Sequence, residues 1–282
     1  MWLIMDVAFY AGILFYVGAA LMALRHLRSA NGEALDLGLR LSTAGAACLA
    51  VTFVCRWAVF HRPPMTTMTD SLNLLILFAT LVMLWVLRKA AVRALMCFYV
   101  PPLTLLCLIN AGVAHRYLHQ APRPLPSAPL MVHVGLVFLS YAMFFLASMT
   151  SGAYIFQTRH LKRHHTSGLF HRLPSLEELD RTLSGLVSLG YPFFVVTLIL
   201  GMLWAWFERD LLGTHWWLAP KVLSSPLMVA FYALAFHARR SGRLRGPKLA
   251  YFVFIGFSSL LLMYVALTLM NLRAYNFWGT PT

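Results

Sequence analysis

The sequence predicts an all-α, polytopic membrane protein: a bundle of eight transmembrane helices in a single integral membrane domain over residues 1–282. Three observations predict this class. Hydrophobic residues make up 60% of the chain and charged residues only 11%, whereas ordinary globular chains carry about 25% charged residues. Apolar runs long enough to cross a bilayer recur along the chain. The basic residues gather on alternate connections between these runs.

Eight apolar runs predict eight membrane-spanning helices, because a helix needs about 20 apolar residues to cross a bilayer. The first run has no basic residue before it and has Arg25 and Arg28 after it, which is the reverse of a signal peptide. We therefore expect it to be retained as the first helix, with its N-terminus outside. The runs cover about residues 3–24, 41–60, 71–87, 94–113, 130–156, 186–207, 222–238 and 249–271.

The basic residues favour the side of the membrane where Arg25 lies, as the positive-inside rule expects of cytoplasmic connections. Sixteen lie on that side: Arg25, Arg28, Arg40, Arg88, Lys89, Arg93, Arg159, Lys162, Arg163, Arg172, Arg181, Arg239, Arg240, Arg243, Arg245 and Lys248. Seven lie on the opposite side or at helix ends there: Arg56, Arg62, Arg116, Arg123, Arg209, Lys221 and Arg273. Both termini are then expected on the outer, periplasmic side. The net charge of +14 is explained by this topology, without a nucleic-acid partner.

Residues 175–186 precede the sixth run and predict a short amphipathic helix on the cytoplasmic membrane surface. Ser175 and Glu178 have the spacing of a capping box. A stripe of leucines at helical spacing is typical of a helix lying in the interface. The stripe consists of Leu176, Leu179, Leu183 and Leu186.

Several kinds of site are disfavoured by the sequence. The four cysteines lie in apolar runs without C-x-x-C spacing, which argues against a zinc site and a disulfide framework. Nothing resembles a Ser-His-Asp set, a phosphate-binding glycine loop or a pair of catalytic carboxylates. The sequence therefore gives no indication of a classical enzyme.

A tryptophan-rich segment, residues 204–221, lies between the sixth and seventh runs on the expected outer side. It has two interpretations. It is an aromatic belt, since tryptophan is enriched at membrane surfaces, or it is a flat apolar platform for a large planar ligand such as a porphyrin. Its aromatic and imidazole side chains are Trp204, Trp206, Trp216, Trp217 and His215.

His133 lies within an apolar run, three residues in and near the expected outer surface, whereas His237, also inside a run, lies at a cytoplasmic helix end. Ionisable groups inside a span are costly and mark functional sites by default; the alternative is a neutral histidine bonded to a loop carbonyl. Haem iron suits such a ligand, because axial ligation by histidine is common. Four basic residues of the expected outer side are candidates to pair with haem propionates, namely Arg56, Arg62, Lys221 and Arg273. The alternative for Arg56 and Lys221 is that they extend to the lipid headgroups.

These residues lie in motifs that resemble those of the cytochrome c assembly superfamily, which includes the CcsA and CcmC haem-handling proteins and HemX-type membrane proteins. The resemblance covers about residues 60–272. Its motifs are residues 63–71 (PPMTTMTDS), 133–142 (HVGLVFLSYA), 173–180 (LPSLEELD), 190–192 (GYP), 201–205 (GMLWA), 213–221 (GTHWWLAPK), 236–239 (FHAR), 242–246 (GRLRG), 250–251 (AY), 256–257 (GF) and Tyr264.

The resemblance implies that residues 213–221 are a haem-binding segment and that His133 is the first outer-face ligand of haem b. Two departures stand out. The family's Trp-Asp-Pro-Lys-Glu core loses both acids here, at Ala219 and Val222, and the family's second histidine ligand is replaced by Arg273. The haem iron would then be five-coordinate, or its coordination would be completed by another residue such as His215, or haem binding has been lost.

Two functions follow. The first is haem handling in cytochrome c-type biogenesis in the bacterial plasma (inner) membrane: haem is presented outside to an apocytochrome c or a partner assembly membrane protein. Its parts are the ligand His133, the tryptophan platform, and the propionate clamps Lys221 and Arg273. The second is a HemX-like accessory protein that acts without haem, on haem biosynthesis or as a scaffold subunit of a membrane complex.

Overall fold

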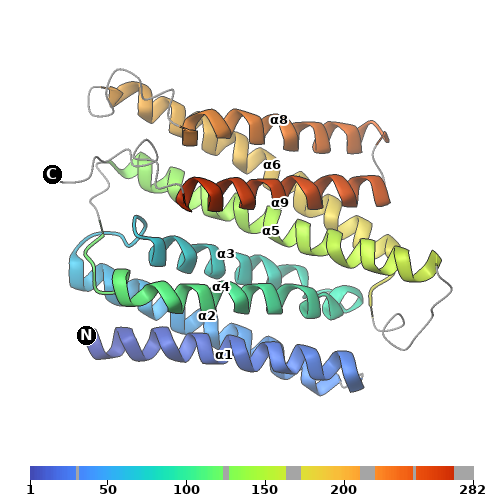
Figure 1. Cartoon of the computed structure of the whole chain (residues 1–282), viewed down its shortest axis with the longest axis horizontal. Coiled ribbons are helices and arrows are strands. Elements are labelled where there is room, and N and C mark those ends of the chain that lie inside the picture. The colour runs from blue at the N-terminus through green and yellow to red at the C-terminus, as the bar shows by residue number, and fades with distance from the viewer. Residues whose placement is uncertain (30–31, 123–126, 163–172, 210–219, 244–245, 270–282) are drawn as a thin grey trace.

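The computed structural model describes residues 1–29, 32–122, 127–162, 173–209, 220–243 and 246–269. Within these residues the chain forms helices and no strand, which confirms the predicted all-α class (Figure 1). The helices are α1 (Trp2–Ser29), α2 (Gly32–Phe60), α3 (Met68–Val86), the short 3-10 helix η1 (Ala90–Leu95), α4 (Met96–Tyr117), α5 (Ala128–Lys162), α6 (Leu176–Phe207), α8 (Pro220–Arg240) and α9 (Pro247–Leu269).

The eight α-helices of the described residues match the eight apolar runs in order. Six of them are long and apolar enough to cross a membrane, namely α1, α2, α3, α4 together with η1, α5 and α6. A multi-pass membrane protein is therefore confirmed. The runs at 222–238 and 249–271 form α8 and α9, and their crossing of the membrane stays a prediction.

The helices run roughly along the long axis of the molecule, so their connections lie at two ends (Figure 1). The starts of α1, α3 and α5 and the ends of α2, α4, α6 and α9 lie at one end, which we call the His133 end. The opposite end, where α1 finishes, is the Arg25 end. Which membrane side each end faces stays a prediction.

Hydrogen bonds between polar side chains join helices inside the apolar core. The Tyr16 hydroxyl in α1 is bonded to Thr80 Oγ1 in α3, and Thr104 Oγ1 in α4 donates to the Tyr16 carbonyl at 2.9 Å. Asn110 Nδ2 in α4 donates to Asn73 Oδ1 in α3 at 2.7 Å. Such bonds hold helices together in lipid, where hydrophobic association supplies no driving force.

Glycines at two of the motif positions make room for aromatic rings. A Cβ atom on Gly256 would lie 1.9 Å from Cε1 of Phe231, and one on Gly190 would lie 2.9 Å from Cε1 of Phe144. Phe144 in turn stacks on Tyr232, with ring centroids 3.6 Å apart. The absent side chains let α5, α6, α8 and α9 approach closely.

Residues 175–186 do not form a separate helix, because α6 runs without a break from Leu176 to Phe207. The expected N-cap is present: the Ser175 side chain accepts a hydrogen bond from the backbone N–H of Glu178 at 3.2 Å. Leu179, Leu183 and Leu186 are at most 1% exposed. The leucine stripe faces the bundle, not the membrane surface, and this corrects the predicted interfacial helix.

Asp180 joins three helices at the Arg25 end. Its Oδ2 accepts a hydrogen bond from Arg239 Nη2 in α8 at 2.7 Å, and its Oδ1 accepts one from the backbone N–H of Gly246, just before α9, at 3.1 Å. The Arg239 and Asp180 side chains are 25% and 21% exposed. Three of the sequence motifs therefore meet at one carboxylate.

We expect Asp180→Ala to lower the free energy of unfolding by about 1–3 kcal/mol, because two partly buried donors lose their acceptor. Thermal unfolding in detergent, followed by circular dichroism, measures the loss. The matched control is Glu177→Ala on the same helix. Glu177 also pairs with an arginine, Arg181, at 3.1 Å, but its side chain is 80% exposed, and exposed pairs at this spacing contribute only about 0.3–0.5 kcal/mol. Equal destabilisation by both variants would contradict the prediction.

Candidate functional site

His133 lies in the second turn of α5, at the His133 end, and is half-buried. Its Nδ1 is 2.9 Å from the backbone carbonyl oxygen of Thr197 in α6. A carbonyl can only accept, so Nδ1 carries the proton in this contact. In the neutral ring the lone pair is then on Nε2. A histidine that binds a metal commonly donates its other N–H to a carbonyl in this way.

Gly201 provides the surface against which the His133 ring packs. A Cβ atom there would lie 2.5 Å from Cε1, 2.9 Å from Nδ1 and 3.3 Å from Nε2 of His133. Thr197, Gly201 and Trp204 follow one another at spacings of four and three residues, so they share one face of α6. That face is turned toward the start of α5.

Two polar atoms on this face of α6 are buried and make no hydrogen bond within the described residues. They are Oγ1 of Thr197, a residue 2% exposed, and the indole Nε1 of half-buried Trp204. A buried polar group without a partner costs about 1–3 kcal/mol. Both atoms are therefore suited to a ligand that supplies hydrogen-bonding groups.

Trp206 does not share the environment of Trp204. Two residues apart on a helix, the two side chains point about 200° apart. Trp206 is 61% exposed, and the Arg209 guanidinium lies 5.4 Å from the centre of its ring. One face of α6 therefore cannot present both indoles as a single flat surface.

The other residues of the expected haem site are only partly covered by the structure. Lys221 lies in the first turn of α8, with its side chain outside the described part. His215, Trp216, Trp217 and Arg273 lie outside the described residues. Their roles stay predictions.

Arg56 is fully buried at the end of α2, so it neither extends to lipid headgroups nor is available to a propionate. Its Nε lies 2.7 Å from Oδ1 of Asp70, which is also buried. Its Nη1 donates to the carbonyl oxygens of Tyr117, at 3.3 Å, and of Leu118, and its Nη2 donates to that of Gln120 at 3.1 Å. The guanidinium thus caps the end of α4.

Asp70 also caps the start of α3. Its Oδ2 accepts a hydrogen bond from the backbone N–H of Thr67 at 3.1 Å, and the Thr67 hydroxyl accepts one from the backbone N–H of Asp70 at 3.2 Å. This is a complete capping box. Neither the buried pair nor this cap was among the features predicted from the sequence. The Thr-x-x-acid spacing at residues 67–70 was the signal that would have revealed the cap.

A second histidine at the same end, His119, is engaged with the start of α1. Its Nε2 lies 3.1 Å from Oδ1 of Asp6, and its ring stacks on Trp2 with centroids 5.2 Å apart. Within the described residues, no group of three or more His, Cys, Asp or Glu side chains could hold a metal ion. A single imidazole suits haem, because the porphyrin supplies all the equatorial ligands of the iron and leaves only an axial position for the protein to fill.

Comparison with known proteins identifies the family to which these motifs belong. Residues 45–273 match the model of the family described as Cytochrome C assembly protein. The chain belongs to the cytochrome c assembly protein family. The matched residues contain the His133–Thr197 contact, the Arg56–Asp70 pair and the Asp180 junction, and the resemblance found in the sequence is confirmed.

Two kinds of family member are similar to this chain. Protein HemX of Brevibacillus brevis is 33% identical over 144 residues, which cover 51% of this chain and 52% of that protein. Protein HemX of Bacillus subtilis (strain 168) is 31% identical over 126 residues, 45% of each chain. Cytochrome c biogenesis protein CcsA of Chlamydomonas reinhardtii is 23% identical over 241 residues, 82% of this chain and 66% of that protein. The chain therefore spans about half the length of the HemX relatives it matches.

Proposed function

We propose that this protein handles haem b at the His133 end, with His133 as the axial ligand of the iron. The observation that carries the proposal is the Nδ1 contact with the Thr197 carbonyl at 2.9 Å. It directs the lone pair to Nε2, the nitrogen that would take the iron. Membership of a family that assembles cytochrome c, itself a haem protein, supports the same conclusion.

The chemistry of the surrounding residues fits a haem. Thr197 and Trp204 each have a buried polar atom that meets no partner in the described part of the chain, and an indole N–H can donate to a carboxylate. In the proposal, Trp204 contacts the porphyrin from the face of α6 that holds Thr197, and Trp216 and Trp217 add apolar surface, whereas Trp206 lies on another face of that helix. Lys221 and Arg273 pair with the propionates, and His215 is the candidate for a second axial ligand.

The proposed role is delivery and assembly, not classical catalysis. Any redox chemistry belongs to the iron when haem is bound, while the protein supplies binding and orientation. We propose an apocytochrome c and a partner assembly membrane protein as the recipients of haem, and the bacterial plasma membrane as the location. The His133 end would then face outward.

We expect the detergent-purified protein, as isolated or after haem addition, to show a Soret absorption band that His133→Ala removes or shifts. Loss of the axial nitrogen changes the ligand field of the iron, which the spectrum reports directly. Absorption spectra of the oxidised and reduced protein measure this.

The control variant is His115→Ala, at the same end of the bundle. His115 is exposed, and its Nδ1 lies 2.9 Å from the carbonyl oxygen of Gly112 in its own helix, so its loss should leave the band unchanged. A folded protein that shows no Soret band even after haem addition would rule out the proposed haem ligation.

That outcome would favour the second function, a HemX-like accessory protein that acts without haem. Two observations support it. The identity to the HemX relatives, 33% and 31% over 51% and 45% of this chain, is higher than the 23% identity to CcsA over 82% of it. The acids of the family's tryptophan-rich core are absent at Ala219 and Val222, and the second histidine is replaced by Arg273. Affinity purification would then be used to look for partner proteins that bind the basic connections between the helices.

A further inference from the structure

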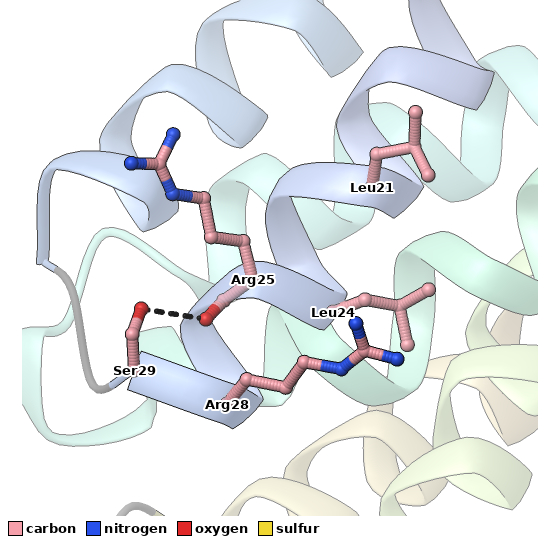
Figure 2. Close-up of a pocket in the computed structure, with 5 residues that line it drawn as sticks. All are labelled: Leu21, Leu24, Arg25, Arg28 and Ser29. Atoms are coloured by element: carbon pink, nitrogen blue, oxygen red, sulfur yellow. Dashed lines mark hydrogen bonds between the residues drawn. The ribbon is translucent and has the colours of Figure 1, made fainter.

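A shallow groove lies on the surface of α1 at the Arg25 end, and Figure 2 shows the side chains that line it. Leu21, Leu24, Arg25 and Arg28 follow one another at helical spacing and share one face of α1. Ser29 completes the lining, with its hydroxyl donating to the Arg25 carbonyl at 2.9 Å. Helix α1 packs on α2 and α4, and all five lining residues are exposed among the helices that the structure describes.

The two arginines of the groove have no counter-charge among the described residues. Neither guanidinium makes an ion pair or a hydrogen bond in the described part of the chain, whereas Arg93 at the same end pairs with Asp36 at 3.1 Å. In Figure 2 the Arg25 and Arg28 side chains start from this face of α1 and point away from each other. Two unpaired cations on one helix face favour an anionic ligand.

The apolar half of the groove distinguishes between kinds of anion. Leu21 and Leu24 are 57% and 46% exposed and lie on the membrane-spanning side of the two arginines. One helical turn rises 5.4 Å, so the charged and apolar halves are within reach of one amphipathic molecule. A soluble anion would contact only the arginines, and an acidic protein segment in water would not reach the leucines.

We propose that this groove binds an anionic phospholipid. The headgroup phosphate lies between Arg25 and Arg28, and an acyl chain lies along Leu21 and Leu24. Arginines at a helix end attract anionic lipids electrostatically, and their long apolar stems suit the boundary between headgroup and hydrocarbon. The site is on a different helix from His133 and does not depend on haem binding.

The test is a native mass spectrometry titration of the full-length protein in detergent. Phosphatidylglycerol and phosphatidylcholine with the same acyl chains are compared. We expect the wild type to bind phosphatidylglycerol more tightly. The double variant Arg25→Gln/Arg28→Gln should weaken this binding about 30-fold, because each basic residue near the surface contributes about fivefold. Its affinity for phosphatidylcholine should not change.

The charge-matched control is Arg88→Gln/Lys89→Gln, which removes two exposed basic residues just after α3 at the same end. It should retain the wild-type affinity for phosphatidylglycerol. If this control loses as much affinity as the groove variant, the effect is one of overall charge and the proposal is overturned. Unchanged binding by the groove variant overturns it as well.

Two further measurements keep the result decisive. Arg25→Lys/Arg28→Lys preserves charge, and we expect it to retain most of the binding, which separates loss of the site from loss of folding. Displacement of the lipid by glycerol phosphate would indicate a site for soluble anions. Displacement by an acidic peptide would indicate a protein partner. Either displacement overturns the proposal, and resistance to both supports it.

Discussion

Arg56→Ala is expected to lower the free energy of unfolding by about 3–5 kcal/mol, the largest stability effect of any substitution considered for this chain. The variant leaves Asp70, 1% exposed, with a buried carboxylate that has lost its cation. It also removes the donors to the carbonyls of Tyr117, Leu118 and Gln120 at the end of α4. The thermal unfolding midpoint of the detergent-solubilised protein measures the loss.

The control for charge removal is Arg93→Ala. Arg93 also pairs with an aspartate, but the Arg93 and Asp36 side chains are 44% and 50% exposed, and pairs of this kind contribute about 0–1 kcal/mol. Replacing both buried partners, as Arg56→Met/Asp70→Leu, should recover part of the stability lost in Arg56→Ala, because no unpaired charge is left. Equal midpoints for the Arg56 and Arg93 variants would refute the structural role of the buried pair.

Gly201→Ala is expected to weaken haem binding about 10- to 100-fold while the helices remain folded. The added Cβ would lie 2.5 Å from Cε1 of His133, so the ring must move and its bond to the Thr197 carbonyl is lost. Loss of a partner that orients a metal ligand typically has an effect of this size. Haem titration followed by the Soret band measures the affinity.

Gly185→Ala is the matched control, because a Cβ on Gly185 in the same helix meets nothing within 4 Å. It should leave haem binding unchanged and slightly stabilise α6, since alanine favours helix over glycine. The displacement of the ring has its own readout: NMR of isotopically labelled histidine reports the Nδ1–H tautomer of His133 even if no haem binds. A Gly201→Ala variant with wild-type affinity and an unchanged His133 signal would show that the ring does not depend on this glycine.

The helices could be predicted from the sequence because their signal is local. Each span is a run of apolar residues, and α1 and α8 agree with the runs at 3–24 and 222–238 to within a few residues at each end. The prediction of an interfacial helix was wrong because an apolar stripe has the same sequence pattern whether it faces lipid headgroups or other helices. In the structure Leu179 and Leu183 are fully buried in the bundle.

The candidate site could be predicted only in part. The position of His133 within an apolar run marked it as a functional candidate, whereas its contact with Thr197 joins residues 64 positions apart and has no local signal. Arg56 was misjudged for the same reason. An arginine near the end of a span commonly extends to the membrane surface, and only the fold brings Asp70 and the end of α4 around it.

The environment of Arg56 has a consequence for the biosynthesis of the protein. Asp70, the first of its partners along the chain, follows Arg56 by 14 positions, whereas the acceptor carbonyl of Gln120 follows it by 64 positions. At about 5–20 residues per second, a ribosome needs about 3–13 s to reach it. The α2–α3 hairpin therefore has time to neutralise the Arg56 charge before α4 is complete, so α4 can dock onto a pair that has already formed.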